Sequence, residues 1–342
     1  MTRQRKLWLA AVLLACIHGV ILFAGFVVPY GYADQFRTYP FAAPTRLQFV
    51  DSNGAFHLRP FVYAQPGFSN SLANPEETVQ TFPIHFLVSG KPYKFAGIFS
   101  ARLHLFGVSE PARIFLLGTD EYGRDQFSRF LYGGQISLLS GLLGASVSVF
   151  FGLAVGAMAG FYGGWVDEAL MRLAELFLAC PWLYLLFAVR AALPLHLPEW
   201  QVFILLVGVL GVVGWARPAR LIRGAVLSAK ERNFVRASRS FGASDWHLLS
   251  RHVLPQTYGI ALTQMTLLIP QYVLAEVTLS FLGLGVGEPM PSWGSLLSYL
   301  QHYYVLESYW WMFIPALLLV PTFLAYKAVS DALLEHVKSV SV

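Results

Sequence analysis

Long apolar runs alternate with polar and charged segments along this 342-residue chain. A helix that spans a bilayer needs about 20 mostly apolar residues. The pattern predicts six such helices, in residues 7–30, 136–160, 169–193, 201–217, 258–281 and 309–329. The last begins with three consecutive aromatic residues, Tyr309, Trp310 and Trp311, which is typical of a helix end at the membrane interface.

Composition supports this interpretation. Hydrophobic residues make up 56% of the chain and charged residues 13%, and the mean hydropathy is +0.55. A soluble domain carries about 25% charged residues. The sequence therefore predicts an all-α polytopic membrane protein.

The distribution of positive charge orients these helices. Residues 217–251 contain eight Lys or Arg, whereas the turns 194–200 and 284–308 contain none. Positive side chains concentrate in short cytoplasmic loops. We therefore expect residues 217–251 and both chain termini to be cytoplasmic.

The first apolar run follows three basic residues, Arg3, Arg5 and Lys6. A signal peptide that is cleaved near Ala33 has the same order of basic and apolar residues, but its apolar region is shorter. The length of residues 7–30 favours a retained first helix.

Residues 31–133 interrupt the apolar pattern. Alternating residues around Asn53-Gly54 predict a β-hairpin, and residues 83–88 and 101–108 are further strand candidates. We expect a β-rich extracytoplasmic insert that recognises a partner or covers the pore mouth. Residues 121–133 predict a short amphipathic helix on the outer surface.

Small and charged residues mark special positions in the predicted spans. Gly152, Gly156 and Gly160 repeat every fourth residue, which favours close packing of a second helix. Glu175 and Glu276 should face protein or water, because a charge in lipid is costly. They are candidates for the pore or its gate, although a packing role is equally open. Arg190 lies near a helix end, where it can reach the headgroups.

The basic stretch 230–255 predicts two short helices. Phe234, Ala237 and Phe241 share one face of the first helix, and Gly242 supplies a stop because it tolerates a left-handed conformation. Ser244 or Asp245 can cap the second helix.

That second helix presents Trp246, Leu249 and Val253 on one face, and Pro255 should end it. Spacing alone leaves two alternatives for the pair of helices. They rest on the lipid surface, or they dock into a soluble partner.

Catalytic motifs are lacking. The chain has no G-x-x-x-x-G-K-[ST] phosphate-binding loop, no nucleophile with a base, and no metal-binding spacing. Cys16 and Cys180 lie in apolar runs, where buried thiols are expected. Any ATP hydrolysis would belong to another chain. Two functions remain open at this point. One is an ion-driven secondary transporter, with helices broken at Pro181 and Pro270. The other is a membrane anchor for an ATPase.

Four segments carry a family resemblance: 117–125 (LGTDEYGRD), 161–168 (FYGGWVDE), 275–285 (AEVTLSFLGLG) and 291–297 (PSWGSLL). With them, the chain resembles the C-type permease subunit of dipeptide and oligopeptide ABC importers from residue 117 to about 331. The resemblance implies the type I ABC importer (MetI-like) transmembrane fold.

The resemblance also gives the basic stretch a role, because it is similar to the EAA coupling loop that inserts into an ATPase. The residues to which this role carries over are Arg236, Ala237, Gly242, Ala243, Ser244, Asp245, Leu254 and Pro255. One departure stands out: Arg236 occupies the place of the family's glutamate. We expect the ATPase of this chain to carry a compensating acid, or the contact to differ.

The resemblance implies a transport subunit that is not an enzyme and binds no cofactor. Its partners would be a homologous second permease, two cytoplasmic ABC ATPases that bind ATP, an extracytoplasmic solute-binding protein and the lipid bilayer, with no nucleic acid. The location would be the bacterial inner membrane. The expected division is an N-terminal helix (1–30), the insert with its amphipathic helix (31–133), the permease domain (134–331, coupling loop 230–255) and a cytoplasmic tail (332–342).

Overall fold

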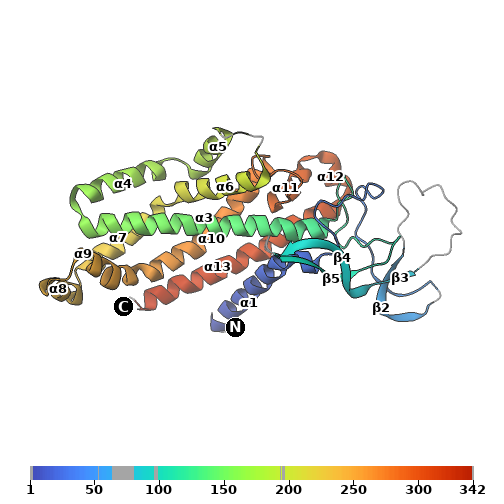
Figure 1. The fold of residues 1–342 in the computed structure, drawn as a ribbon, viewed down its shortest axis with the longest axis horizontal. Coiled ribbons are helices and arrows are strands. Elements are labelled where there is room, and N and C mark those ends of the chain that lie inside the picture. Colours follow the sequence, from blue (N-terminus) through green and yellow to red (C-terminus); the bar gives the residue numbers. More distant parts are fainter. Residues whose placement is uncertain are drawn as a thin grey trace. The chain divides into compact units, whose positions relative to one another are not determined.

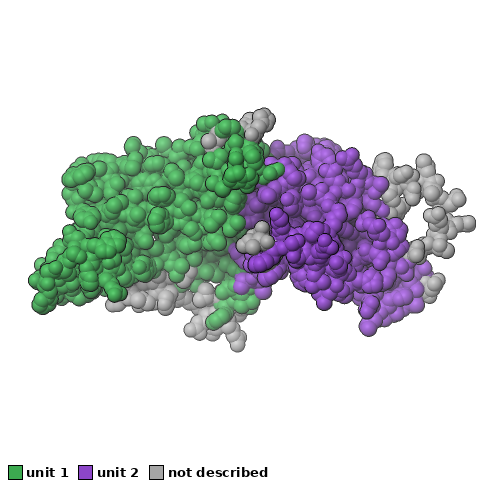
Figure 2. Space-filling model, viewed as in Figure 1, with its two compact units in different colours: residues 1–14, 137–285, 322–342 green, residues 15–136, 286–321 purple. Residues whose placement is uncertain are grey.

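The computed structural model describes residues 3–52, 54–63, 81–95, 99–192, 194 and 197–340, and most of them are helical (Figure 1). The chain forms two compact units (Figure 2). Unit 1 comprises Met1–Leu14, Ser137–Gly285 and Thr322–Val342, and unit 2 comprises Ala15–Ile136 and Val286–Pro321. Residues 286–321 thus belong to the same unit as the segment that precedes the predicted permease domain.

The N-terminal part contains two helices and five strands. They are α1 (Arg3–Leu22), α2 (Ala24–Val27), β1 (Gln48–Val50), β2 (Phe56–Tyr63), β3 (Thr81–Pro83), β4 (His85–Phe95) and β5 (Phe99–Gly107).

The rest of the described chain is helical. Its α-helices are α3 (Gln126–Tyr162), α4 (Gly164–Ala179), α5 (Trp182–Ala192), α6 (Glu199–Gly214), α7 (Ala216–Lys230), α8 (Asn233–Ser240), α9 (Asp245–His247), α10 (Tyr258–Phe281), α11 (Trp293–Ser298), α12 (Tyr303–Ser308) and α13 (Ile314–Val340). A π-helix (Leu248–Val253) and 3₁₀ turns (Leu254–Thr257, Tyr299–Gln301 and Trp310–Phe313) join some of them.

The strands form two antiparallel sheets, β1-β2-β3 and β4-β5. Pairing of β1 with β2 confirms the predicted hairpin. Gly54 of its turn has a φ of +82°, whereas Asn53 lies outside the described residues. Both further strand candidates lie in paired strands. A buried apolar cluster beneath the strands contains Val62, Phe82, Ile84, Phe106, Ala112 and Ile114. The extracytoplasmic location of this segment stays a prediction.

Three described helices are long and apolar enough to cross a membrane: 126–162, 245–281 and 310–332. Two further pairs qualify only as broken spans, α4 with α5 at an angle of 87° and α6 with α7 at 44°. The apolar part of α1, Trp8–Leu22, is shorter than a full span. The count of six spans therefore remains a prediction.

The prediction of a separate amphipathic helix at residues 121–133 is wrong. Helix α3 begins at Gln126 and continues without a break to Tyr162. Arg124, Asp125 and Arg129 are buried, not displayed to a membrane surface. The two arginines pair with Asp120 and Glu288 inside unit 2, so the amphipathic spacing there reflects a polar core contact.

Two prolines act differently from expectation. The predicted continuous span 169–193 is bent sharply at Cys180-Pro181, where α4 ends and α5 begins. Pro255, expected to end a helix, instead lies in the 3₁₀ turn that leads directly into α10. A proline near the start of a helical segment is tolerated because that N–H would lack an intrahelical partner anyway.

The glycine strip on α3 is confirmed as a packing surface. A Cβ at Gly152 would lie 2.6 Å from Pro218 Cβ, and one at Gly160 would lie 2.8 Å from Val226 Cγ1. At Gly156 it would collide with the backbone oxygen of Ala219. Helix α7 therefore lies directly on the strip, closer than any side chain on α3 would allow.

Candidate functional site

The predicted coupling segment folds as a compact element between α7 and α10. Helix α8 ends in a hydrogen-bonded turn: Gly242 N–H donates to Arg239 O at 3.0 Å, and Ala243 N–H donates to Ser238 O at 3.2 Å. Gly242 has a φ of +82°. This pair of bonds is a Schellman motif, which terminates a helix through a left-handed residue. The helix stop predicted at Gly242 is confirmed.

The second helix starts immediately after this turn. The Ser244 side chain caps α9 by accepting a hydrogen bond from His247 N–H at 3.3 Å. Arg239 lies 3.6 Å from Asp245 in an exposed ion pair across the turn. A pair so exposed contributes little to stability, so the turn is set mainly by its backbone.

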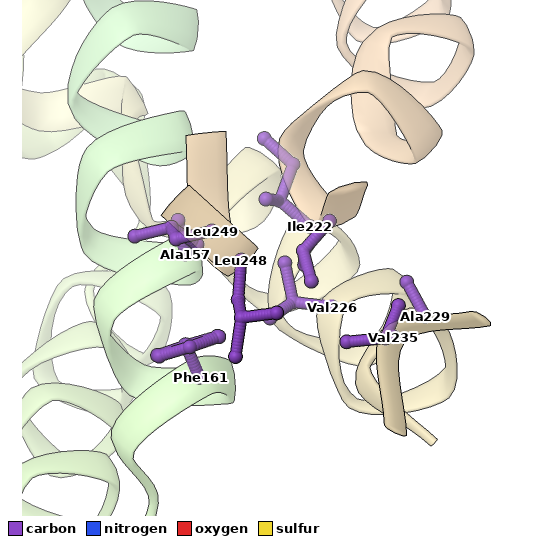
Figure 3. Close-up of a cluster of buried hydrophobic side chains, with 9 residues drawn as sticks. Ala157, Phe161, Ile222, Val226, Ala229, Val235, Leu248 and Leu249 are labelled. Atoms are coloured by element: carbon purple, nitrogen blue, oxygen red, sulfur yellow. The ribbon is translucent and has the colours of Figure 1, made fainter. Parts of the chain in front are cut away.

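A buried apolar cluster fixes the element to the helices behind it (Figure 3). Ala157 and Phe161 of α3 and Ile222, Val226 and Ala229 of α7 form the base of the cluster. Val235 of α8 and Leu248, Leu249 and Val253 of the π-helix pack onto that base. The element is therefore continuous with the hydrophobic core of unit 1, which makes it a rigid projection.

The exposed aromatic residues differ from the predicted faces. Val235, not Phe234 or Phe241, is the buried anchor of α8. Phe241 is 92% exposed and Trp246 is 73% exposed, on either side of Gly242. Two large apolar side chains thus extend from this turn, and the described part of the chain leaves both uncovered.

The residues assigned to the coupling role lie together in this element. Most are exposed on its outer surface, namely Arg236, Ala237, Gly242, Ser244, Asp245 and Pro255, whereas Ala243 and Leu254 pack partly against the apolar cluster. Among the described residues, the guanidinium of Arg236 has no hydrogen-bond or ion-pair partner. Its charge is available to another molecule.

Two polar contacts at the base were not predicted. Arg223 of α7 donates Nε and Nη2 to Asp167 of α4 at 2.5 and 2.6 Å. Lys230 Nζ donates to Gly160 O at the end of α3 at 2.8 Å. Asp167 lies in segment 161–168, so the sequence draws attention to this acid. Nothing in the sequence identifies Arg223, 56 residues later, as its partner.

The two carboxylates proposed for the pore or gate lie in different environments. Glu175 is half-exposed on α4 and pairs with Arg172 one turn away. Glu276 is fully buried in α10 and accepts a hydrogen bond from Ser280 Oγ at 2.6 Å. Arg190, expected near the headgroups, is instead buried and donates to Leu284 O.

A second polar cluster lies in unit 2 and includes residues of segment 117–125. Arg124 donates to Asp120 at 2.6 Å and to Glu288 at 2.5 Å, and its Nη2 donates to Tyr299 Oη. Arg129 donates to Glu288 Oε1 at 2.8 Å. Both arginines are buried, so the carboxylates neutralise charges that would otherwise be very costly.

The pKa values of Glu288 and Asp125 are shifted in opposite directions. Burial raises the pKa of Glu288, but the guanidinium groups of Arg129 and Arg124 outweigh burial and hold that pKa below its usual value. Burial raises the pKa of Asp125 to about 7, although Ser128 donates two hydrogen bonds to its carboxylate. Asp125 caps α3 through these bonds.

No group of three or more His, Cys, Asp and Glu side chains in the described part of the chain could hold a metal ion. The arrangement offers an exposed, rigid docking element and paired helices, which suit a mechanical role.

The chain is similar to known membrane transport proteins. Residues 152–339 match the family described as the binding-protein-dependent transport system inner membrane component. The dipeptide transport system permease protein DppC of Bacillus subtilis (strain 168) is 36% identical over 217 residues, which are 63% of this chain and 66% of the relative. The oligopeptide permease OppC of the same organism is 35% identical, over 65% of this chain and 71% of the relative.

A third relative is the glutathione transport system permease protein GsiD of Pectobacterium atrosepticum, which is 34% identical over 65% of this chain and 72% of its own length. Among solved structures, the MetNI methionine ABC transporter in inward-facing conformations matches 61% of this chain and 95% of its own chain, at 18% identity and a TM-score of 0.47. The family match covers the glycine strip, both broken helices and the coupling segment. The chain therefore belongs to the family of binding-protein-dependent transport system inner membrane components, and its resemblance to the dipeptide and oligopeptide permeases is confirmed.

Proposed function

We propose that this chain is the permease subunit of an ATP-driven importer of dipeptides or oligopeptides in the bacterial inner membrane. The carrying observation is the coupling element, in which Phe241 and Trp246 are exposed on a turn fixed to the core of unit 1. Large exposed apolar side chains on a rigid base are typical of a protein docking site. Family membership and the similarity to dipeptide and oligopeptide permeases support peptide as cargo.

The proposed assembly contains this chain, a homologous second permease and two cytoplasmic ATPases, each of which receives one coupling element. ATP binds to the ATPases, and this chain holds no cofactor of its own. An extracytoplasmic solute-binding protein delivers peptide to the outer face. Both chain termini lie in the cytoplasm, as the eight basic residues within 217–251 favour.

Transport follows from a change in preferred conformation. When ATP brings the ATPases together, they must bind one arrangement of the two coupling elements more tightly than the other. Because the coupling element shares a core with α3 and α7, its displacement moves those helices as well. The permease pair then alternates between outward-facing and inward-facing states.

Reconstitution in liposomes tests this proposal. The complete assembly with binding protein should take up labelled peptide only when ATP is supplied on the ATPase side, and peptide-loaded binding protein should stimulate ATP hydrolysis. Collapse of ion gradients should leave uptake unchanged. Uptake by the permease alone, driven by an ion gradient, would contradict the proposal.

A further inference from the structure

The two helix breaks of unit 1 contribute to one cavity. Its volume is about 220 Å³, and its lining includes Cys180, Pro181 and Trp182 at the α4–α5 break. Arg217 enters it from the first turn of α7, just beyond the α6–α7 break, and Gln271 and Tyr272 enter it from the middle of α10. Drug-sized ligands occupy sites of about 300–1,000 Å³, so this cavity suits one end of a peptide and not a whole one.

Arg217 contributes a positive charge to the lining of this cavity, in which the other lining residues are uncharged. Its side chain is exposed, and among the described residues it makes no hydrogen bond or ion pair. Three other cations of unit 1 have partners: Arg190 donates to Leu284 O, Arg223 pairs with Asp167, and Lys230 donates to Gly160 O. Arg220 is exposed like Arg217, but it does not line the cavity. A guanidinium that lines a cavity and has no partner among the described residues can pair with an anion that enters the cavity.

Arg217 lies in the first turn of α7, about 20 Å along the helix from Lys230, since 13 residues separate the two. Gln271 lies near the middle of α10 and makes no side-chain hydrogen bond among the described residues. The cavity therefore holds one positive charge and one amide that have no partners among the described residues.

The hydroxyl of Tyr272, another lining residue, already has a hydrogen-bond partner. Tyr272 Oη and Ser148 Oγ are 2.8 Å apart, and Ser148 Oγ also lies 3.0 Å from Gly211 O. A Cβ on Gly214 would collide with Tyr272 Oη. The Tyr272 hydroxyl thus contacts Ser148 of α3. The aromatic rings of Tyr272, Phe177 and Trp182 contribute apolar surface to the cavity lining.

We propose that this cavity binds the terminal carboxylate of the peptide cargo, with Arg217 as its principal ligand and Gln271 as a second donor. A guanidinium donates two parallel N–H groups to a carboxylate, which is the strongest common pairing for that anion. The aromatic wall contacts the adjoining side chain. This inference rests on the proposed peptide importer, because only that function supplies the carboxylate.

Cys180 provides a direct reporter, because it lines the cavity and its thiol is exposed, contrary to the buried thiol expected from the sequence. In a Cys16→Ala background, the anionic reagent sulfonatoethyl methanethiosulfonate is compared with the cationic trimethylammonioethyl reagent on membrane vesicles that contain the whole transporter. Rates are normalised to a free thiol. We expect Arg217→Gln to lower the anionic-to-cationic rate ratio roughly tenfold, since the nearby charge acts on the two reagents in opposite directions.

Two variants serve as controls. Arg220→Gln removes another exposed arginine of α7 that does not line the cavity, and it should leave the ratio unchanged. Arg217→Lys keeps the charge and should retain most of the ratio, which separates loss of charge from loss of folding. A ratio that is the same in Arg217→Gln and in the parent would overturn the proposal.

Protection of Cys180 identifies the anion. Dialanine delivered with the binding protein should slow labelling several-fold, and dialanine amide, which lacks the carboxylate, should not. Arg217→Gln should abolish this protection and raise the KM for dialanine uptake about tenfold, the usual scale for a charge-assisted hydrogen bond. Protection by inorganic phosphate or by added anionic phospholipid, with none by dialanine, would overturn the assignment to cargo.

The two proposals can fail separately. ATP-dependent peptide uptake with no dependence of Cys180 labelling on Arg217 would refute the carboxylate site and leave the importer standing. Absence of ATP-dependent uptake would refute the importer, and with it the cargo assignment, even if Arg217 still controlled the charge preference of labelling.

Discussion

Arg223 of α7 and Asp167 of α4 form a bidentate ion pair, with Nε and Nη2 at 2.5 and 2.6 Å from the two carboxylate oxygens. Arg223 precedes Val226 by about one helical turn in α7, and Val226 belongs to the apolar cluster that supports the coupling element. The ion pair joins α4 to the helix that leads into that element.

A double-mutant cycle should show strong coupling between these two residues. Asp167→Asn and Arg223→Gln should each lower stability by about 1–3 kcal/mol, and the double variant should be little worse than either. Thermal unfolding in detergent measures the cycle. The exposed pair Arg172–Glu175, on the same α4, is the control and should couple by less than about 0.5 kcal/mol. Equal coupling energies for both pairs would contradict a special role for Arg223.

Gly156 should not accept a larger residue. Its Cβ would collide with the backbone of α7, so Gly156→Val must separate the two helices, at a cost of about 1–3 kcal/mol or more. We expect a lower unfolding temperature and weaker retention of the ATPase. Gly208→Val in α6 is the matched control, because nothing lies within 4 Å of that position. Similar losses in both variants would indicate a general effect of valine in a helix.

Gly242→Val tests the turn of the coupling element. The position is open, so the expected cost of about 1–3 kcal/mol comes from the left-handed φ of +82° and not from a collision. The turn should rearrange, and ATP-dependent uptake should be abolished while membrane insertion is unchanged. Gly224→Val in α7, which is also open but helical, should keep most uptake. Full uptake by Gly242→Val would exclude a coupling role for this turn.

Arg236→Glu tests the charge that replaces the family's acid. If an acidic group of the ATPase faces this exposed arginine, reversal should weaken co-purification of the ATPase by about tenfold, which corresponds to about 1.4 kcal/mol. Reversal of the facing acid should restore binding. Arg220→Glu, at an exposed position on α7, should have no effect. Unchanged co-purification of Arg236→Glu would mean that the residue is merely solvated.

Asp125 should make stability depend on pH. Its pKa is raised from 3.8 to about 7 by burial. The folded state therefore favours the protonated acid, so the stability contribution is complete below pH 4 and is lost as the pH rises through 7. Asp125→Asn should remove this slope between pH 4 and 8 in thermal unfolding, since an amide oxygen can still accept from Ser128. A slope that survives in Asp125→Asn would assign it to other groups.

The sequence predicted features that depend on local geometry. The glycine strip and the stop at Gly242 follow from backbone requirements that only glycine meets, and both are present. On the predicted face of the second helix, Leu249 and Val253 are buried and Trp246 is exposed. Periodicity reveals which side chains are apolar but not what covers them. Phe241 is exposed, whereas Val235 is buried.

Contacts between distant segments could not be predicted. Arg129 donates to Glu288, 159 positions away, and amphipathic spacing at residues 121–133 gives no sign of this partner. The cavity also depends on two bends of 87° and 44°. A proline indicates where a helix can bend, but the angle depends on the helices that pack around it.

The junction at Pro255 has a mechanical consequence. From Asp245 to Phe281 the chain is helical over 37 residues without an intervening loop, a length of about 55 Å. Trp246 lies near one end of this segment and Glu276 near the other. A tilt of about 5° about the far end moves the near end by about 5 Å, one helical turn. In the proposed importer, a small tilt of this segment would therefore displace the surface that docks onto the ATPase by about 5 Å.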